Sequence, residues 1–326
     1  MTTEATYTIT AEEAGTRLDA FLASQVDGWS RSRLTAAITD GDVLVNGKEA
    51  KPSYKVRDGD EIEVELTELP PATFTPEDIP LDIIYEDDYL AVINKPAGLV
   101  VHPGAGVPGG TLANALAFHF GFSTLEFGSD GRDDQSQIQD LKSKIGIVHR
   151  LDKDTSGLIV VAKDEATVEE LSRQFHDRLV EKSYVALVHG FAEDNSGTID
   201  RPIARHKHNR TRMTIAAHGR NALTLWRVRE RFDKFTLLNV DIKTGRTHQI
   251  RVHLASINHP VVGDDAYNAG RDQTVADLKI RKGIADLNRF FLHAEKLAFT
   301  HPKSGERLHF RQELPDELTQ FLALLS

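Results

Sequence analysis

The chain has 326 residues, of which 40% are hydrophobic, which is enough for two domains that each bury a core. It contains no cysteine, which excludes disulfides, thiol nucleophiles and cysteine-ligated zinc and fits a reducing compartment. The formal net charge of -10 argues against a nucleic-acid partner only weakly, because the distribution of charge matters more than its total.

The first residues, MTTEATYTIT, lack the basic and apolar regions of a signal peptide. No apolar run in the sequence approaches the roughly 20 residues that are needed to span a bilayer. We therefore expect a cytoplasmic protein with no membrane partner.

Residues 16–66 have the pattern of a small α/β module. One helical face of TRLDAFLASQV carries Leu18, Phe21, Leu22 and Val26. Ser30 is placed to be the N-cap of a second helix, which Gly41 would end. The strand VLV then leads into Asn46-Gly47, a pair typical of a tight hairpin turn, and VRDGDEIEVEL predicts a further turn and strand.

LPPATFTPEDIP, residues 69–80, carries four prolines and predicts an extended linker, because proline fixes φ and donates no backbone hydrogen bond. From residue 81 onward, predicted strands (YLAVINK, GLIVVAK, SYVALVHG, FTLLNVDIK) mix with predicted helices (TLANALAFHF, TVEELSRQFHD, PDELTQFLALL), which indicates one large α+β domain. Residues 122–142 predict an exposed loop, and residues 268–290 are a second polar insertion.

Three motifs resemble sites for a bound ion or nucleotide, and each has a plainer explanation. DKDTSG begins like a calcium loop, but the twelfth position, where such a loop needs a glutamate, is Lys163. GAGVPG, residues 104–109, matches a dinucleotide-binding fingerprint but has Pro103 directly before it where a strand is needed, so we interpret it as a loop. His248 and His253 are five residues apart and would face opposite ways on a strand. We therefore predict no metal site and no dinucleotide site.

HRLDKDTSG reads as a turn between two apolar strands. Asp152 or Asp154 can cap such a turn by accepting backbone N–H bonds, which is the more common role of a turn aspartate. Alternatively, Asp152 is a carboxylate nucleophile, which must stay ionised and lie close to its target. Arg150 and Lys153 are close in sequence, but neighbouring residues of an extended chain point apart, so a better arginine partner would come from elsewhere.

KTGRTHQIRVH, residues 243–253, offers Arg246 and Arg251 as such partners, although a plain basic surface is the alternative. KSYVALVHG places Tyr184 on a short strand, where a tyrosine is more often a core residue. Residues 201–220 contain six Lys or Arg, three His and no acidic residue, so this stretch can form a basic face on an acidic protein.

Together, HRLDKDTSGL, KSYVALVHG and TGRTHQIRVH resemble, in this order and spacing, the RluA/RluD-type family of pseudouridine synthases. INKPAGLVVHP resembles the opening motif of that family, and WSRSRL and VLVNGK resemble an S4 RNA-binding domain. The resemblance implies an α+β fold, with a small S4-like α/β module and a large pseudouridine-synthase domain whose mixed, mainly antiparallel sheet is flanked by helices. The predicted boundaries are an N-terminal extension at 1–15, the S4-like domain at 16–68, the linker at 69–80 and the catalytic domain at 81–326.

The resemblance also implies roles for single residues. Asp152 would be the catalytic residue, Tyr184 would pack against the target base, and Arg251 would pair with Asp152, with Arg246 as the second candidate for that pairing. Arg150 would occupy the space that the base vacates. The candidate RNA contacts are basic side chains of the S4-like module and of the acid-free stretch: Arg31, Arg33, Lys48, Lys51, Arg205, Arg210 and Arg212.

The implied reaction isomerises specific uridines in large-subunit (23S) ribosomal RNA, presented either as free RNA or as an assembling or assembled 50S subunit. It breaks the N1–C1′ bond of a flipped-out uridine, rotates the uracil and joins C5 to C1′. No oxidation and no phosphate transfer occur, so no cofactor is expected. The carboxylate can attack C1′, add to C6 or remove a ribose proton, and the sequence leaves these routes open. We expect a monomer. The rival functions are a non-catalytic RNA-binding or ribosome-assembly factor on the same fold and an oxidoreductase built on GAGVPG.

Overall fold

A computed structural model covers the chain and describes all residues except 1, 9, 11, 27–30, 41–42, 68–74, 104–106, 122–145, 207–208, 210–211, 218 and 326. The side chains of residues 2–6, 31–33, 36, 40 and 65–67 are likewise not described. Contacts divide the chain into two compact units, one containing residues 1–73 and the other residues 74–123 and 137–326. The predicted caps Ser30 and Gly41 and the predicted loop at 122–142 lie outside the described residues.

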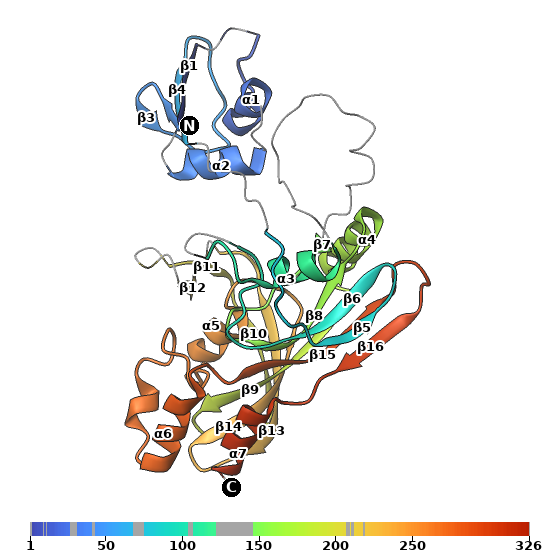
Figure 1. The fold of residues 1–326 in the computed structure, drawn as a ribbon. Coiled ribbons are helices and arrows are strands. Elements are labelled where there is room, and N and C mark those ends of the chain that lie inside the picture. Colours follow the sequence, from blue (N-terminus) through green and yellow to red (C-terminus); the bar gives the residue numbers. More distant parts are fainter. Residues whose placement is uncertain are drawn as a thin grey trace. The chain divides into compact units, whose positions relative to one another are not determined.

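The first unit is a four-stranded antiparallel sheet covered by two helices, as Figure 1 shows. Its strands pair in the order β1-β4-β2-β3, and its elements are β1 (Thr2–Thr8), α1 (Leu18–Gln25), α2 (Arg31–Asp40), β2 (Val43–Val45), β3 (Lys48–Glu49) and β4 (Glu61–Thr67). The predicted apolar face of α1 is buried against Leu34, Ile38 and Ile62. Asn46 and Gly47 both have positive φ, as the predicted hairpin turn requires. Strand β1 lies within the segment treated above as an extension and pairs with β4.

The second unit is built on a ten-stranded mixed sheet with the order β10-β13-β14-β9-β15-β8-β6-β5, to which β16 adds on β15 and β7 on β8. Among the strands that the structure describes, β15 and β8 are the only pair in parallel, so the predicted mixed, mainly antiparallel sheet is confirmed. Its strands are β5 (Ile83–Glu86), β6 (Leu90–Lys95), β7 (Gly146–Ile147), β8 (Ser156–Ala162), β9 (Glu181–His189), β10 (Ser196–Asp200), β13 (Leu223–Arg231), β14 (Phe235–Ile242), β15 (Leu292–Thr300) and β16 (Arg307–Arg311).

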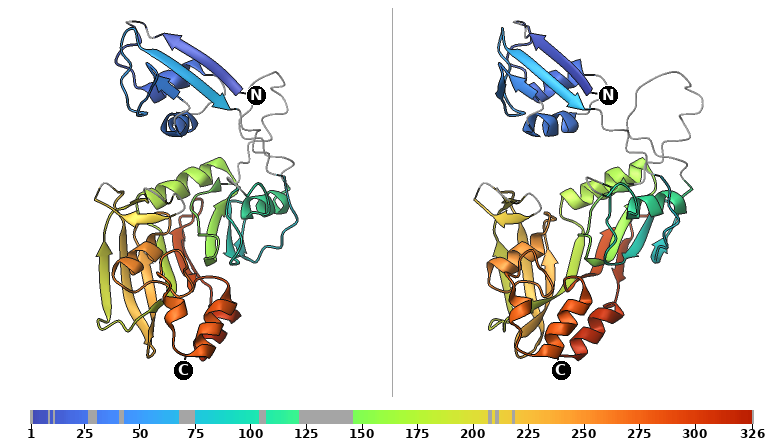
Figure 2. Two further views of the ribbon diagram at one scale, coloured as in Figure 1. Left: turned by 90° about the vertical axis from the view of Figure 1, so that its left-hand side faces the viewer. Right: turned by 60° about the vertical axis from the view of Figure 1, so that its left-hand side comes forward.

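Strand β8 is buried along its whole length because both faces of the sheet are covered there. On β8, Ile159 and Val161 pack into one core cluster, while Leu158, Val160 and Ala162 pack into another. The flanking helices are α3 (Leu112–His119), α4 (Glu165–His176), α5 (Gln249–Ser256), α6 (Leu278–Leu287) and α7 (Asp316–Ala323). Figures 1 and 2 show α6 and α7 side by side at one end of the sheet.

Two segments differ from the sequence analysis. HQIRVH was considered as a strand, which is wrong: His248 has left-handed backbone angles and Gln249 begins helix α5. The polar insertion at 268–290 is not a plain loop, since it contains a 3-10 turn (Arg271–Thr274) and helix α6, whose Ile284 packs into the core beneath α7. A separate two-stranded hairpin, β11 (Ile203–Arg205) and β12 (Met213–Ile215), lies within the acid-free stretch.

Candidate active site

The turn that carries Asp152 joins β7 to β8 and is anchored by hydrogen bonds from another segment. Lys95, at the end of β6, is fully buried, and its Nζ donates to the carbonyl oxygens of Pro96, Leu99 and Lys153 at 2.8, 2.8 and 2.9 Å. The N–H of Gly98 donates to the same Lys153 carbonyl. The motif containing Lys95 therefore fixes the turn that follows Asp152.

Gly157 explains why the turn ends in Ser-Gly. Its φ is +110, and a Cβ atom there would lie 2.3 Å from the carbonyl oxygen of Ala294 on β15. Only glycine lets β8 approach β15 this closely at the point where the parallel pairing begins. This close packing sets the position of the turn relative to the centre of the sheet.

The Asp152 carboxylate is bound by an arginine rather than by the backbone of its own turn. Its Oδ2 accepts a hydrogen bond from Nη1 of Arg251 at 3.1 Å, and within the described residues the carboxylate caps no backbone N–H. The Asp152 side chain is 18% exposed, so it borders solvent while its partner is buried. The capping interpretation of Asp152 is thus not what the structure shows.

Arg251 is held by a second, deeply buried carboxylate. Its Nε and Nη2 donate to both oxygens of Asp264 at 2.7 and 2.8 Å, and the Asp264 side chain is 1% exposed. The guanidinium lies over the rings of Phe290 and Tyr267, at 4.2 and 5.0 Å from their centres. Burial on its own would lower the pKa of Arg251, but the hydrogen bonds and charge of Asp264, and after it Asp152, raise the pKa further above its ordinary value. Arg251 is therefore a permanent cation beside Asp152.

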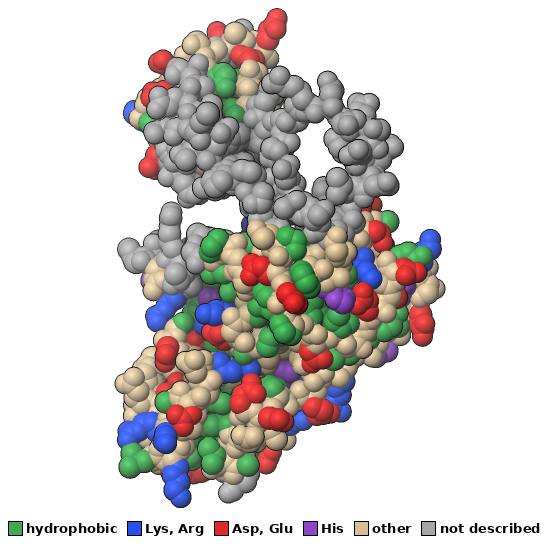
Figure 3. All heavy atoms as spheres, in the orientation of Figure 1, with side chains coloured by type: hydrophobic (Ala, Val, Ile, Leu, Met, Phe, Trp, Pro, Cys, Tyr) green, Lys and Arg blue, Asp and Glu red, His purple; other side chains and the backbone are tan. Residues whose placement is uncertain are grey.

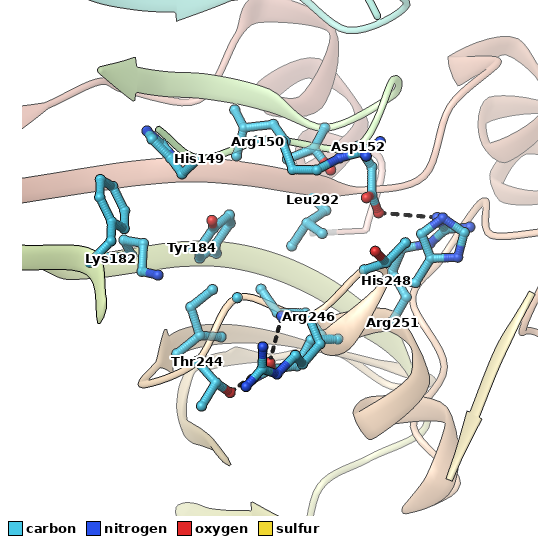
Figure 4. A pocket seen from close by; sticks show the side chains of 18 of the residues that line it. His149, Arg150, Asp152, Lys182, Tyr184, Thr244, Arg246, His248, Arg251 and Leu292 are labelled. Carbon is cyan, nitrogen blue, oxygen red and sulfur yellow. Dashed lines mark hydrogen bonds and ion pairs between the residues drawn. The ribbon is translucent and has the colours of Figure 1, made fainter. Parts of the chain in front are cut away.

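A cavity of about 490 Å³ opens in front of Asp152. Most of its wall residues come from three segments that are far apart in sequence, namely the turn after β7, the start of β9 and the loop between β14 and α5. Figure 4 shows Asp152, His248 and Arg251 together at one end, Lys182 and His149 at the other, and Tyr184 between them. The cavity is large enough for a nucleoside, and its reactive carboxylate lies at one end.

Tyr184 lies on β9 between β14 and β15 and is buried to 7% exposure. Burial first, and then the charge of Asp152, raise the pKa of Tyr184 above its ordinary value. The hydroxyl therefore keeps its proton, and the ring offers the cavity an apolar face on which a base can stack.

The far end of the cavity carries a cation without a carboxylate partner among the described residues. Lys182 lies two residues before Tyr184 on β9, and its Nζ sits 5.2 Å from the centre of the Phe175 ring. Burial lowers the pKa of Lys182 to about 8. Burial also lowers the pKa of His149 to about 3, and this neutral ring stacks on Phe175 and accepts the N–H of Val160. His149 thus has a structural role.

The remaining predicted cavity residues are placed as follows. Arg246 lines the cavity, but its Nε donates to the carbonyl oxygen of Asn221, so Arg251 and not Arg246 binds Asp152. Arg150 is exposed, lies at the rim of this cavity and of a second one on the other side of Asp152, and makes no side-chain bond within the described part of the chain.

The predicted RNA contacts fall in both units. Lys48 and Lys51 are exposed on the first unit beside a concave surface next to β3, and the side chains of Arg31 and Arg33 lie outside the described residues. In the second unit, Arg205 is exposed on β11 and Arg212 precedes β12, while Arg210 lies outside the described residues.

Three site residues were missed by the sequence analysis. Asp264 binds Arg251, Tyr267 packs on its guanidinium, and His248, which was considered only as a metal ligand, lines both cavities beside Asp152. No local pattern distinguishes Asp264 from Asp265 or marks Tyr267, because their partners lie on other segments.

Among the described residues, no group of three or more His, Cys, Asp or Glu could hold a metal ion. No helix in that part of the chain is long and apolar enough to cross a bilayer.

Comparison with known proteins agrees with this geometry. The family model for RNA pseudouridylate synthase matches residues 89–256, and the model for the S4 domain matches residues 16–62. The chain is 42% identical to ribosomal large subunit pseudouridine synthase D of Xanthomonas campestris over 96% of this chain and 89% of that protein. It is 41% identical to the uncharacterized RNA pseudouridine synthase YlyB of Bacillus subtilis, over 97% and 96%.

Among solved structures, human RNA pseudouridylate synthase domain containing 1 aligns with a TM-score of 0.53 at 26% identity, covering 73% of this chain and 85% of that one. The alignment supports the fold of the second unit independently of the close sequence relatives. The family model itself spans the Asp152 turn, Tyr184 and the Arg251 helix. The chain therefore belongs to the RNA pseudouridylate synthase family of isomerases.

Proposed function

We propose that this enzyme converts uridine to pseudouridine in large-subunit ribosomal RNA, with Asp152 as its catalytic residue. The observation that carries the proposal is a carboxylate that is bound to a permanent cation and borders a nucleoside-sized cavity. The ribosomal substrate rests on relatives that are named for the large subunit and align over nearly their whole length. Family membership and the assembled site argue against the non-catalytic alternative.

The geometry supports a simple sequence of events. The target uridine leaves its stack, which costs a few kcal/mol and least in a loop. Stacking on Tyr184 recovers roughly 1–3 kcal/mol of that cost. Asp152 then meets the nucleotide while its carboxylate is bound to the Arg251 guanidinium. Attack at C1′, addition at C6 and removal of a ribose proton differ in the atom that the carboxylate reaches, and all three need this ionised group at the cavity wall.

RNA binding would be shared between the S4 domain and the second unit. Figure 3 shows acidic and basic side chains intermixed on the displayed face of the second unit, so the net charge of -10 does not make that face uniformly acidic. We place phosphate contacts at Lys48 and Lys51 and at Arg205 and Arg212. Such contacts orient the RNA without reading its sequence. Arg150, exposed at the cavity rim, is the candidate to fill the space that the base vacates. We expect the enzyme to act in the cytoplasm as a monomer.

Asp152→Asn tests the catalytic role. The variant keeps the size of the side chain and should fold normally, but its rate of pseudouridine formation should fall by about 10³-fold or more. Asp154→Asn is the matched control, since Asp154 lies in the same turn and makes no bond to Arg251. The readout is pseudouridine mapping in ribosomal RNA from cells that lack the protein and carry either variant. Normal modification with Asp152→Asn would refute the assignment.

A further inference from the structure

His248 has an unusual backbone conformation and a well-defined hydrogen-bond partner. Its φ of 54 places a non-glycine residue in the left-handed region, directly before helix α5. Such conformations persist where the surrounding structure fixes them, and they cluster at functional sites. The Nδ1 atom of His248 lies 2.8 Å from the hydroxyl of Tyr267. The same hydroxyl lies 2.8 Å from the backbone N–H of Met213, at the start of β12.

These contacts favour the tautomer of His248 in which Nδ1 accepts a hydrogen bond. The hydroxyl of Tyr267 accepts from the Met213 N–H, and its own proton is then free to be donated to Nδ1 of His248. Burial raises the pKa of Tyr267 above its ordinary value, so the hydroxyl remains a donor. Burial also lowers the pKa of His248, which favours the neutral ring. A neutral imidazole that accepts at Nδ1 carries its hydrogen on Nε2.

This Nε2–H is available to a ligand. Within the described residues it has no protein partner, and His248 lines the cavity on the same wall as Asp152 and Arg251. Figure 4 shows the His248 ring beside both of these side chains. The site therefore offers a substrate one anion, Asp152, and one neutral N–H donor next to it.

The symmetry of uracil gives this donor a use in both halves of the reaction. A half-turn about the axis through N3 and C6 exchanges N1 with C5 and the carbonyl oxygen O2 with O4. In the substrate, O2 lies beside the N1 that is bonded to C1′; in the product, O4 lies beside the C5 that is bonded to C1′. One fixed donor near C1′ can therefore bind a carbonyl oxygen before and after the rotation.

We propose that Nε2–H of His248 donates to the uracil oxygen next to the reacting atom, first O2 and then O4, and that Tyr267 positions this donor. The proposal rests on the proposed function. The donor is not consumed: the N1–C1′ bond breaks, the C5–C1′ bond forms, C5 loses its proton and N1 gains one. The negative charge that gathers on the detached uracil falls on its carbonyl oxygens, where a preorganised donor is most effective.

Two amide substitutions of His248 test the role of its N–H donor separately from any effect on folding. The amide nitrogen of glutamine reaches about as far as Nε2, whereas that of asparagine reaches only about as far as Nδ1. Both keep a polar side chain, and asparagine tolerates left-handed angles well. In single-turnover assays on a synthetic RNA hairpin carrying a mapped target uridine, His248→Asn should lower the rate by about 10²-fold. His248→Gln should recover at least tenfold of this loss, and Tyr267→Phe should cost about threefold to tenfold.

A substrate change tests the contact itself. Replacing O2 of the target uridine by sulfur, a weak acceptor, should slow the wild-type enzyme and have a much smaller effect on His248→Asn. The intrinsic effect of sulfur on the ring is common to both enzymes and cancels in this comparison. His309→Gln, on the exposed part of β16, is the control and should behave as wild type. Equal sulfur effects in wild type and His248→Asn would overturn the proposal. An inactive wild-type enzyme on every ribosomal hairpin would instead count against the proposed function.

Discussion

Asp264 is the residue whose replacement tests the electrostatic design of the site most directly. It binds two N–H groups of Arg251 at 2.7 and 2.8 Å and accepts the backbone N–H of Ala266 at 3.2 Å. Asp264→Asn keeps the shape of the side chain but removes its charge and turns one acceptor into a donor. That new donor faces an N–H of the guanidinium, so one of the two bonds is lost and the other becomes weaker.

The expected loss of stability follows from these contacts. A hydrogen bond to a charged group contributes about 1.5–3 kcal/mol, and removing one partner of a buried ion pair costs about 3–5 kcal/mol. Asparagine retains one acceptor, and Asp152 still neutralises Arg251 in part. We therefore expect the free energy of unfolding to fall by about 2–4 kcal/mol. Because the guanidinium then loses its fixed orientation toward Asp152, we also expect the turnover number to fall by about tenfold to a hundredfold.

Urea denaturation measures the first effect as a shift of the midpoint at unchanged slope, and single-turnover formation of pseudouridine measures the second. The Asp264 side chain is only 1% exposed, so the affinity for RNA should stay within about twofold of wild type while the chemical step slows. Asp265→Asn is the matched control: Asp265 is exposed, and within the described residues only its backbone carbonyl accepts a bond, from Arg212. A variant of Asp264 with wild-type stability and turnover would show that Arg251 needs no second carboxylate.

Two further predictions concern RNA binding. Tyr184→Phe should bind RNA within about twofold of wild type, because stacking needs the ring and the hydroxyl stays protonated; a complete loss of binding in a filter assay would give the phenol a direct contact. Replacing Arg31 and Arg33 together by alanine should weaken binding and reduce the slope of log affinity against log salt by about 1.5, as expected for two lost phosphate contacts. If the slope of log affinity against log salt stayed unchanged between low and moderate salt, these arginines would not be phosphate contacts.

The sequence predicts the strands of the large sheet well, since their signals are local. YLAVINK and GLIVVAK are short apolar runs that end in a turn or a charged residue, and they become β6 and β8 at the centre of the sheet. The helices α3, α4 and α7 likewise follow from their apolar periodicity. These elements are confirmed because each buries the side chains that the pattern marks.

Helix α5 shows where the pattern fails. In QIRVHL, apolar and polar residues alternate as in a strand. All six side chains are buried in the helix, so the sequence lacks the polar face that would mark a helical period. The loop before the helix fixes its first residue, because the side-chain oxygen of Gln249 accepts from the hydroxyl of Thr244 and from the N–H of Arg246. Those bonds are visible only once the loop after β14 is folded. The same holds for Asp264, which lies 13 residues from its partner Arg251.

The ion cluster of Asp152, Arg251 and Asp264 is hard to explain by stability alone. Buried charges lose hydration, and well-packed apolar residues of similar volume are often as stabilising or more so. What the cluster provides is an asymmetry between its two carboxylates. Both carboxylate oxygens of Asp264 accept hydrogen bonds from Arg251. Asp152 accepts from Arg251 through Oδ2 alone, and Oδ1 of Asp152 has no partner within the described residues. One cation thus binds both carboxylates, while the outer one, which lines the cavity, retains an oxygen that has no partner among the described residues. An apolar replacement could match the packing, but it could not present that oxygen to a nucleoside.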